Sequence, residues 1–129
     1  MRRPARIPRI VPVAMKQPDP KRSATHLAFI RTLPCCVCSK GGPSEAAHVR
    51  SGTDGGIGMK PSDKWTVPLC HEHHRRQHDI GELAFWSEQC VDPLGLASEL
   101  WTNSGNDDRG HRAVARTVQA VQMGRVDHG

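Results

Sequence analysis

The chain has 129 residues, 36% of them hydrophobic and only 4% aromatic, with no Tyr. That length suits one domain with a thin apolar core, which a bound metal would help to hold together. No apolar run approaches the roughly 20 residues needed to cross a bilayer, and prolines interrupt the positive N-terminus before a signal-peptide core can form. We therefore expect a cytoplasmic protein with no membrane partner.

The net charge of +5 is unevenly distributed along the chain. Residues 1–34 hold eight Lys or Arg and one acidic residue, a net of +7, whereas residues 79–129 have a net charge of −4. Lys and Arg neutralise phosphates and release counterions, so this distribution suits a polyanionic partner. A solubilising or targeting tail would have the same composition.

The first segment, residues 1–22, holds five prolines and seven Lys or Arg and shows no helical or strand periodicity. We predict a flexible basic arm there. Ser23 then provides an N-cap for a short helix in which Leu27, Ile30 and Leu33 recur at three-residue spacing. Pro34 is predicted to end that helix.

Residues 35–78 predict a turn, a strand, a glycine-rich loop, a second strand and a helix, in that order. The turn is PCCVC, and the first strand is EAAHVR. The loop covers residues 51–63. The second strand follows from the period-two alternation of Trp65, Val67 and Leu69 with Lys64, Thr66 and Pro68. CHEHHRRQH then forms a knuckle that opens a helix.

The remaining residues predict helices that pack on the core. One runs from Ile80 to Cys90 with Leu83, Phe85 and Trp86, and a second begins at Asp92-Pro93 with Leu94, Ala97, Leu100 and Trp101. A last helix starts at Asp107 or Asp108 and ends at Gly124, with Val114, Val118 and Val121 on one face. We predict a folded domain over residues 23–104, followed by a C-terminal helix and tail over 105–129.

Two pairs of residues have the spacing of metal ligands. Cys35 and Cys38 are separated by two residues, and so are Cys70 and His73. Each such pair can curl around one side of a tetrahedral ion, which predicts a structural Zn²⁺ site. Cys36 is left as a spare buried thiol, because a Cys-x-Cys pair chelates poorly. Cys90 has no metal-like partner and is assigned to the core.

Three further histidines form a second group. His74 and His78 are four residues apart, so on a helix they share one face, where a divalent cation could bind between them and a phosphate. His48 lies on the preceding strand, from which it can point across the hairpin toward that helix. An imidazole with a pKa near neutrality is suited to taking a proton from water.

The segments PCCVC, AAHVR and SDKWTVPLCHEHHRRQH together resemble the HNH, or ββα-metal, endonucleases. They look most like a phage and prophage group that includes recombination-enhancement nucleases, and the resemblance covers residues 25–104. It implies an α+β fold, in which a small ββα-metal hairpin-helix unit with a zinc knuckle is flanked by additional helices.

The resemblance also implies roles for single residues. His48 would be the general base, and His74 and His78 would bind the catalytic Mg²⁺, Mn²⁺ or similar ion. Asp63 falls where the middle residue of the motif belongs, either orienting His48 or binding the metal. Many relatives place an acidic ligand directly before the base histidine, where this chain has Ala47. Arg75 and Arg76 lie on the same helix, from which either could contact a DNA phosphate.

The expected function is that of a metal-dependent DNA endonuclease of phage or prophage origin, acting in the bacterial host cell. Its partner would be DNA, with phage or host recombination proteins as further partners. Two other classes remain open. A non-catalytic zinc-ribbon DNA-binding module would not need His48 or His74, and a recombination-complex interaction domain would dock through the acidic C-terminal half.

Overall fold

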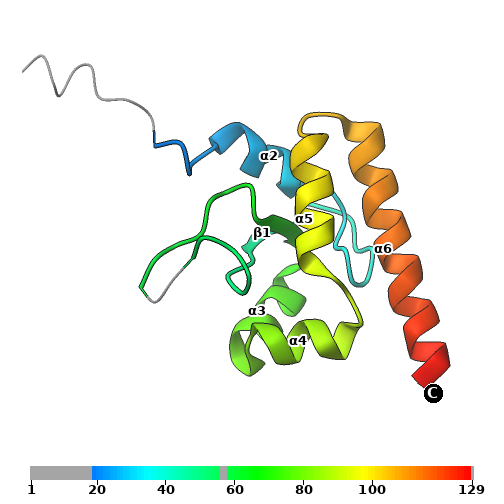
Figure 1. Ribbon diagram of the computed structural model, residues 1–129. Helices are drawn as coiled ribbons and strands as arrows, with labels where there is room; N and C mark the ends of the chain where they lie inside the picture. The colour runs from blue at the N-terminus through cyan, green and yellow to red at the C-terminus, as the bar shows by residue number, and fades with distance from the viewer. Residues whose placement is uncertain (1–18, 56–57, 129) are drawn as a thin grey trace, which may run out of the picture.

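The computed structural model describes residues 19–55 and 58–128, with side chains as far as Gly124. Residues 1–18 of the predicted arm lie outside the described part. The elements are α2 (Ala24–Thr32), β1 (Glu45–His48), β2 (Thr66–Leu69), α3 (His71–Ile80), α4 (Glu82–Gln89), α5 (Pro93–Thr102) and α6 (Asp107–His128) (Figure 1). Helices around a two-stranded sheet confirm the predicted α+β class.

The two strands form one antiparallel hairpin. Glu45 pairs with Leu69 at one end of the ladder, and His48 pairs with Thr66 at the other. Both strands are shorter than predicted. All four residues of β2 are buried, so the period-two alternation that predicts the strand does not give it an exposed face. Helices α2, α3 and α5 all contact β2, so the side chains on both faces of this strand are covered.

Local capping sets two of the helix starts as the sequence predicts. The Ser23 side chain accepts a hydrogen bond from the His26 amide at the start of α2. The Asp92 carboxylate accepts from the amides of Leu94 and Gly95 at the start of α5, where Pro93 occupies the first turn. The helix α2 ends before Pro34, also as predicted.

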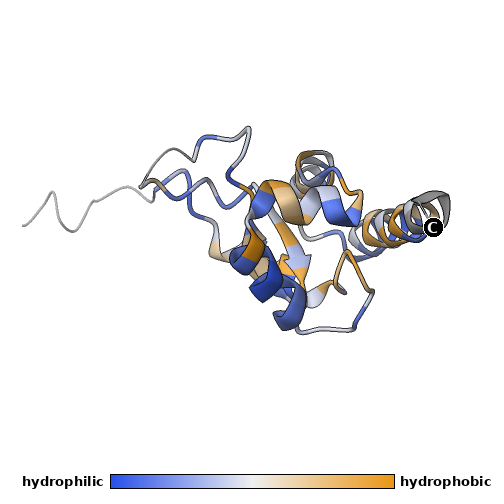
Figure 2. Cartoon of the chain, turned by 90° about the horizontal axis from the view of Figure 1, so that it is seen from below, coloured by the Kyte–Doolittle hydropathy of each residue, from blue (hydrophilic) through white to orange (hydrophobic). Residues whose placement is uncertain are grey.

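The core lies where α2 and α5 pack on the hairpin and α6 packs on α5, and hydrophobic segments of these elements can be followed in Figure 2. Phe29, Ile30, Leu33, Phe85, Leu100 and Val114 are among its buried members. A side chain on Gly110 would meet the Phe29 ring at 2.7 Å, so glycine allows α6 to approach α2 closely. None of the described helices is both long and apolar enough to span a membrane.

Four predictions about the C-terminal helices are wrong. Leu83 is 74% exposed and Trp101 is 43% exposed, although both were expected in the core. Cys90 is also exposed and takes a left-handed conformation (φ 59°) that ends α4. Gly124 does not end the last helix, which continues to His128. A single glycine costs a helix about 1 kcal/mol, too little to stop a helix held by packing.

Candidate metal centre and histidine cleft

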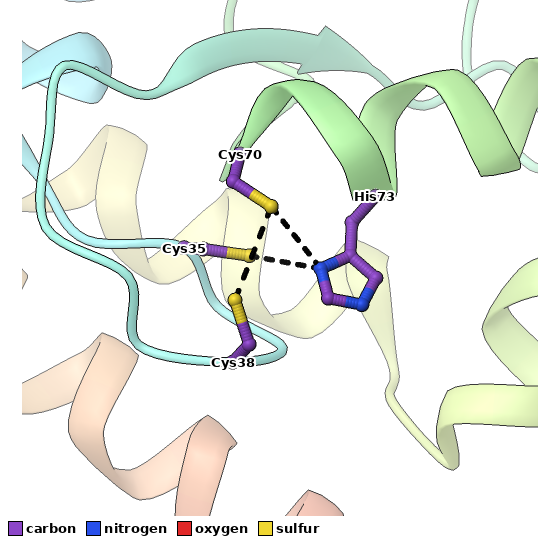
Figure 3. Close-up of side chains that lie close together, drawn as sticks. All are labelled: Cys35, Cys38, Cys70 and His73. Atoms are coloured by element: carbon purple, nitrogen blue, oxygen red, sulfur yellow. Dashed lines mark hydrogen bonds between the residues drawn. The ribbon is translucent and has the colours of Figure 1, made fainter.

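Cys35, Cys38, Cys70 and His73, which we call the metal centre, converge from two parts of the chain (Figure 3). The turn after α2 supplies the first two cysteines, Cys70 is the N-cap of α3, and His73 lies in the first turn of that helix. The Cys70 Sγ lies 3.2 Å from His73 Nδ1 and 3.9 Å from Cys38 Sγ. Cys35 Sγ lies 3.8 Å from His73 Nδ1.

These separations fit one tetrahedral ion. Around such an ion, two sulfurs or a sulfur and a nitrogen lie about 3.6–3.8 Å apart, given ordinary metal–ligand bond lengths. All four ligand atoms lie within 4.8 Å of one another. The four residues that the sequence pairs predict are therefore brought together, and they could hold a metal ion.

Two thiols of this region, Cys36 and Cys38, have raised pKa values. Burial raises the pKa of Cys38 to about 11, and the neighbouring Cys35 sulfur adds to the increase, although a backbone hydrogen bond from Lys40 opposes it. Burial likewise raises the pKa of Cys36 well above its ordinary value. Cys36 is fully buried and lies outside the four-residue group, in agreement with its prediction as a spare thiol.

A second arrangement centres on His48 at the end of β1. Its Nε2 lies 2.8 Å from Oδ1 of Asp63, whose side chain is buried. That carboxylate also accepts hydrogen bonds from the Ser23 amide (2.8 Å) and from Arg22 Nη1 (3.0 Å). Burial acts to raise the pKa of Asp63, but these three donors outweigh it and hold the pKa below its ordinary value.

The ionised Asp63 determines which nitrogen of His48 carries the proton. A carboxylate only accepts hydrogen bonds, so Nε2 must donate, and Nδ1 then keeps its lone pair. Burial lowers the pKa of His48, and nearby Lys60 and Arg22 lower it further, while Asp63 only partly opposes them. The imidazole is therefore neutral at pH 7 and able to accept a proton at Nδ1.

His48, His74 and His78 line one cleft of about 260 Å³, which we call the histidine cleft. The Nε2 atoms of His74 and His78 are 3.2 Å apart, one helical turn along α3. The cleft thus unites the three histidines that the sequence groups together. Its remaining walls are formed by Ala46, Arg50, Lys60 and Pro61.

Glu45 contacts the candidate site and is not indicated by any motif of the sequence. Its Oε1 lies 2.7 Å from His74 Nδ1, and its Oε2 lies 2.9 Å from His71 Nδ1. The hydrogen bonds to these two histidines lower the pKa of Glu45. The strand register carries the signal, because pairing Glu45 with Leu69 places it beside the residues that begin α3.

The arginines predicted to contact DNA do not line the histidine cleft. Arg76 makes a two-pronged ion pair with Glu88, at 2.8 Å from Nε and 2.6 Å from Nη2. Arg75 is exposed on α3. The basic side chains inside the cleft are instead Arg50 and Lys60, on the loop side of the hairpin.

Comparison with known proteins gives two matches. The family described as "Protein of unknown function (DUF968)" matches residues 11–91, which include the metal centre and the histidine cleft. "Uncharacterized protein YdfU" of Escherichia coli (strain K12) is 34% identical over 67 residues, which are 50% of this chain and 19% of YdfU. The chain thus spans about a fifth of the length of this curated relative. No solved structure matches the chain.

Proposed function

The chain belongs to the DUF968 family, and we propose that it is a divalent-metal-dependent endonuclease that hydrolyses DNA phosphodiester bonds. The observation that carries the proposal is the histidine cleft, in which a neutral, carboxylate-held His48 lies with the His74–His78 pair. The resemblance to HNH endonucleases supports the proposal. On the same resemblance we propose that the protein is of phage or prophage origin and associates with recombination proteins.

In this proposal His48 is the general base. Nδ1 of the neutral imidazole accepts a proton from the water that attacks phosphorus, while Asp63 holds Nε2 and stabilises the charge that develops on the ring. Asp63 is 2% exposed, and its two oxygens already accept from His48, Arg22 and Ser23. It is therefore suited to orienting the base rather than to binding an ion.

His74 and His78 are the residues that would hold the catalytic ion. Two imidazole nitrogens bound at about 2.1 Å to one ion, roughly 100° apart, are separated by about 3.2 Å, which is the separation present here. Glu45 accepts from His74 Nδ1, so the lone pair of this ring lies on Nε2. When bound, the ion would polarise the scissile phosphate and stabilise the leaving oxygen. Imidazole ligands favour Mn²⁺ or Ni²⁺ over Mg²⁺.

The charges around the cleft suit a phosphate backbone. Arg50 and Lys60 line its wall, and six further Lys or Arg lie in residues 1–21. Such groups bind polyanions through counterion release, independently of base sequence. These charges therefore support DNA as the proposed partner of both the cleft and the arm.

We further propose that the ion of the metal centre is a structural Zn²⁺. Three cysteines and one histidine are a typical closed zinc set that leaves no open position for substrate. The centre joins the turn after α2 to the first turn of α3, and His73 directly precedes His74. Zinc bound there would hold α3 in place against the hairpin, and with it His74 and His78.

A plasmid-cleavage assay tests the proposed activity. Purified full-length protein, carrying its zinc, is incubated with supercoiled plasmid and with single-stranded DNA in Mg²⁺, Mn²⁺ or Ni²⁺. We expect nicked or linear products only when such an ion is added. If no substrate is cut with any ion, the endonuclease proposal is wrong. A protein that still binds DNA under those conditions would support the zinc-ribbon binding module instead.

The His74→Ala variant should bind the catalytic ion at least about 10- to 100-fold more weakly, since losing a ligand should cost no less than losing a group that orients one. Cleavage should then need correspondingly more Mn²⁺, while zinc content stays at one per chain. Calorimetric titration of Mn²⁺ into zinc-loaded protein measures the change. The control is His111→Ala, which removes an exposed histidine on α6. Equal Mn²⁺ affinity in wild type and His74→Ala would contradict this ligand assignment.

A further inference from the structure

Residues 21–23, which lie about 40 residues before Asp63, hold it from several directions. The Arg22 guanidinium lies 3.0 Å from Asp63 Oδ1, and the Ser23 amide donates to Oδ2 at 2.8 Å. The Asp63 amide in turn donates to the Lys21 carbonyl at 2.8 Å. The side chain of Asp63 is only 3% exposed, so these donors take the place of water. The orientation of this carboxylate therefore depends on the end of the predicted arm.

Arg22 also holds one wall of the histidine cleft. Its Nη1 donates to the Pro61 carbonyl at 2.9 Å, and its Nη2 donates to the Lys60 carbonyl at 3.2 Å. Lys60 and Pro61 both line the cleft. One guanidinium thus ties the carboxylate behind His48 to the backbone that presents Lys60.

We infer that Arg22 is a positioning residue of the proposed nuclease, acting on His48 through Asp63 and on the cleft wall through residues 60–61. The inference rests on the proposed function for its effect on catalysis. Asp63 Oδ1 is shared between His48 Nε2 and Arg22 Nη1, so the arginine fixes the atom from which His48 takes its orientation. The segment from residue 19 is then part of the catalytic unit rather than of a separable arm.

The contacts of Arg22 distinguish it from an arginine that binds DNA. Its charge is paired with the buried Asp63 carboxylate and lies near Asp19, and its guanidinium donates to three acceptors of the protein. Losing it should change the geometry of the base more than the affinity for a polyanion. Lysine would keep the charge, but its ammonium is a single point that cannot reproduce the planar fork.

The test compares Arg22→Ala and Arg22→Lys with Arg31→Ala in the full-length protein. Arg31 is exposed on α2, so its replacement removes the same charge without the contacts. We expect the rate at saturating DNA to fall about 10- to 100-fold in Arg22→Ala, the usual effect of losing a residue that orients a site residue through a hydrogen bond. The fall should be smaller in Arg22→Lys. DNA affinity should change no more than it does in Arg31→Ala. Zinc content and circular dichroism verify folding.

A second readout does not depend on cleavage. Nitrogen-15 NMR of His48 should show one tautomer, protonated at Nε2, in wild type, and a mixture of tautomers in Arg22→Ala. If the tautomer and the saturated rate stay at wild-type values while DNA affinity falls, Arg22 is a phosphate contact and the inference is wrong. If wild type cuts no DNA, the proposed function fails, and the tautomer alone decides the role of Arg22. Should Arg22→Ala not fold, the same comparison is made with Arg22→Lys.

Discussion

Replacing Cys70 by Ser should release the bound metal and unfold the domain. Cys70 is the N-cap of α3 and is 5% exposed, with its sulfur 3.2 Å from His73 Nδ1. In small sites of this kind the free energy of zinc binding, on the order of 10 kcal/mol or more, becomes free energy of folding. That is comparable to the whole stability of a domain, about 5–15 kcal/mol. Zinc analysis and thermal unfolding followed by circular dichroism measure the loss.

The control variants are Cys36→Ser and Cys90→Ser. Cys90 is exposed, so its replacement should leave both zinc and stability unchanged. Cys36 is buried outside the metal centre, so a hydroxyl there should lower the free energy of unfolding by about 1–3 kcal/mol while zinc stays bound. A Cys70→Ser protein that remains folded and fully zinc-loaded would disprove the ligand assignment. If Cys36→Ser loses its zinc, the ligand assignment must change to a cysteine pair that includes Cys36.

The His48→Ala variant should keep its fold, its zinc and its divalent-ion affinity, but lose most of its cleavage activity. The change removes the proton acceptor and one of the three donors to Asp63, which keeps Arg22 and Ser23 as partners. A positioned general base contributes typically about 10² to 10⁴-fold. Single-turnover plasmid nicking, with His111→Ala as the matched control, measures the effect. Cleavage at the wild-type rate would overturn the proposed mechanism and favour a binding module that does not need His48.

The pH dependence gives the same assignment a second check. Burial holds the pKa of His48 below its ordinary value, so the ring is already neutral at pH 7. The wild-type rate should therefore be level around neutral pH and fall only on acidification, as His48 becomes protonated and can no longer accept. With His74 and His78 kept saturated with Mn²⁺, the fall in rate on acidification that is due to His48 should be absent from the residual activity of His48→Ala.

The sequence by itself determined the features that depend on neighbouring residues. The caps at Ser23 and Asp92 follow from side chains that reach an amide two or three positions along the chain. The metal centre follows from two pairs with chelating spacing, because each pair needs only one turn of backbone to present both ligands. The alignment of His74 with His78 follows from helical periodicity alone.

Only the tertiary structure decided which distant groups meet. The register of β1 on β2 brought Glu45 to His74, and nothing local to Glu45 indicates that partner. The burial of Asp63 placed Arg22 beside it across some 40 residues. The helical spacing of apolar residues did not reveal that Leu83 and Trp101 stay exposed, because exposure depends on which helices pack together. Local spacing thus predicts ligands and caps, whereas the charges around His48 arise from contacts between segments far apart in the chain.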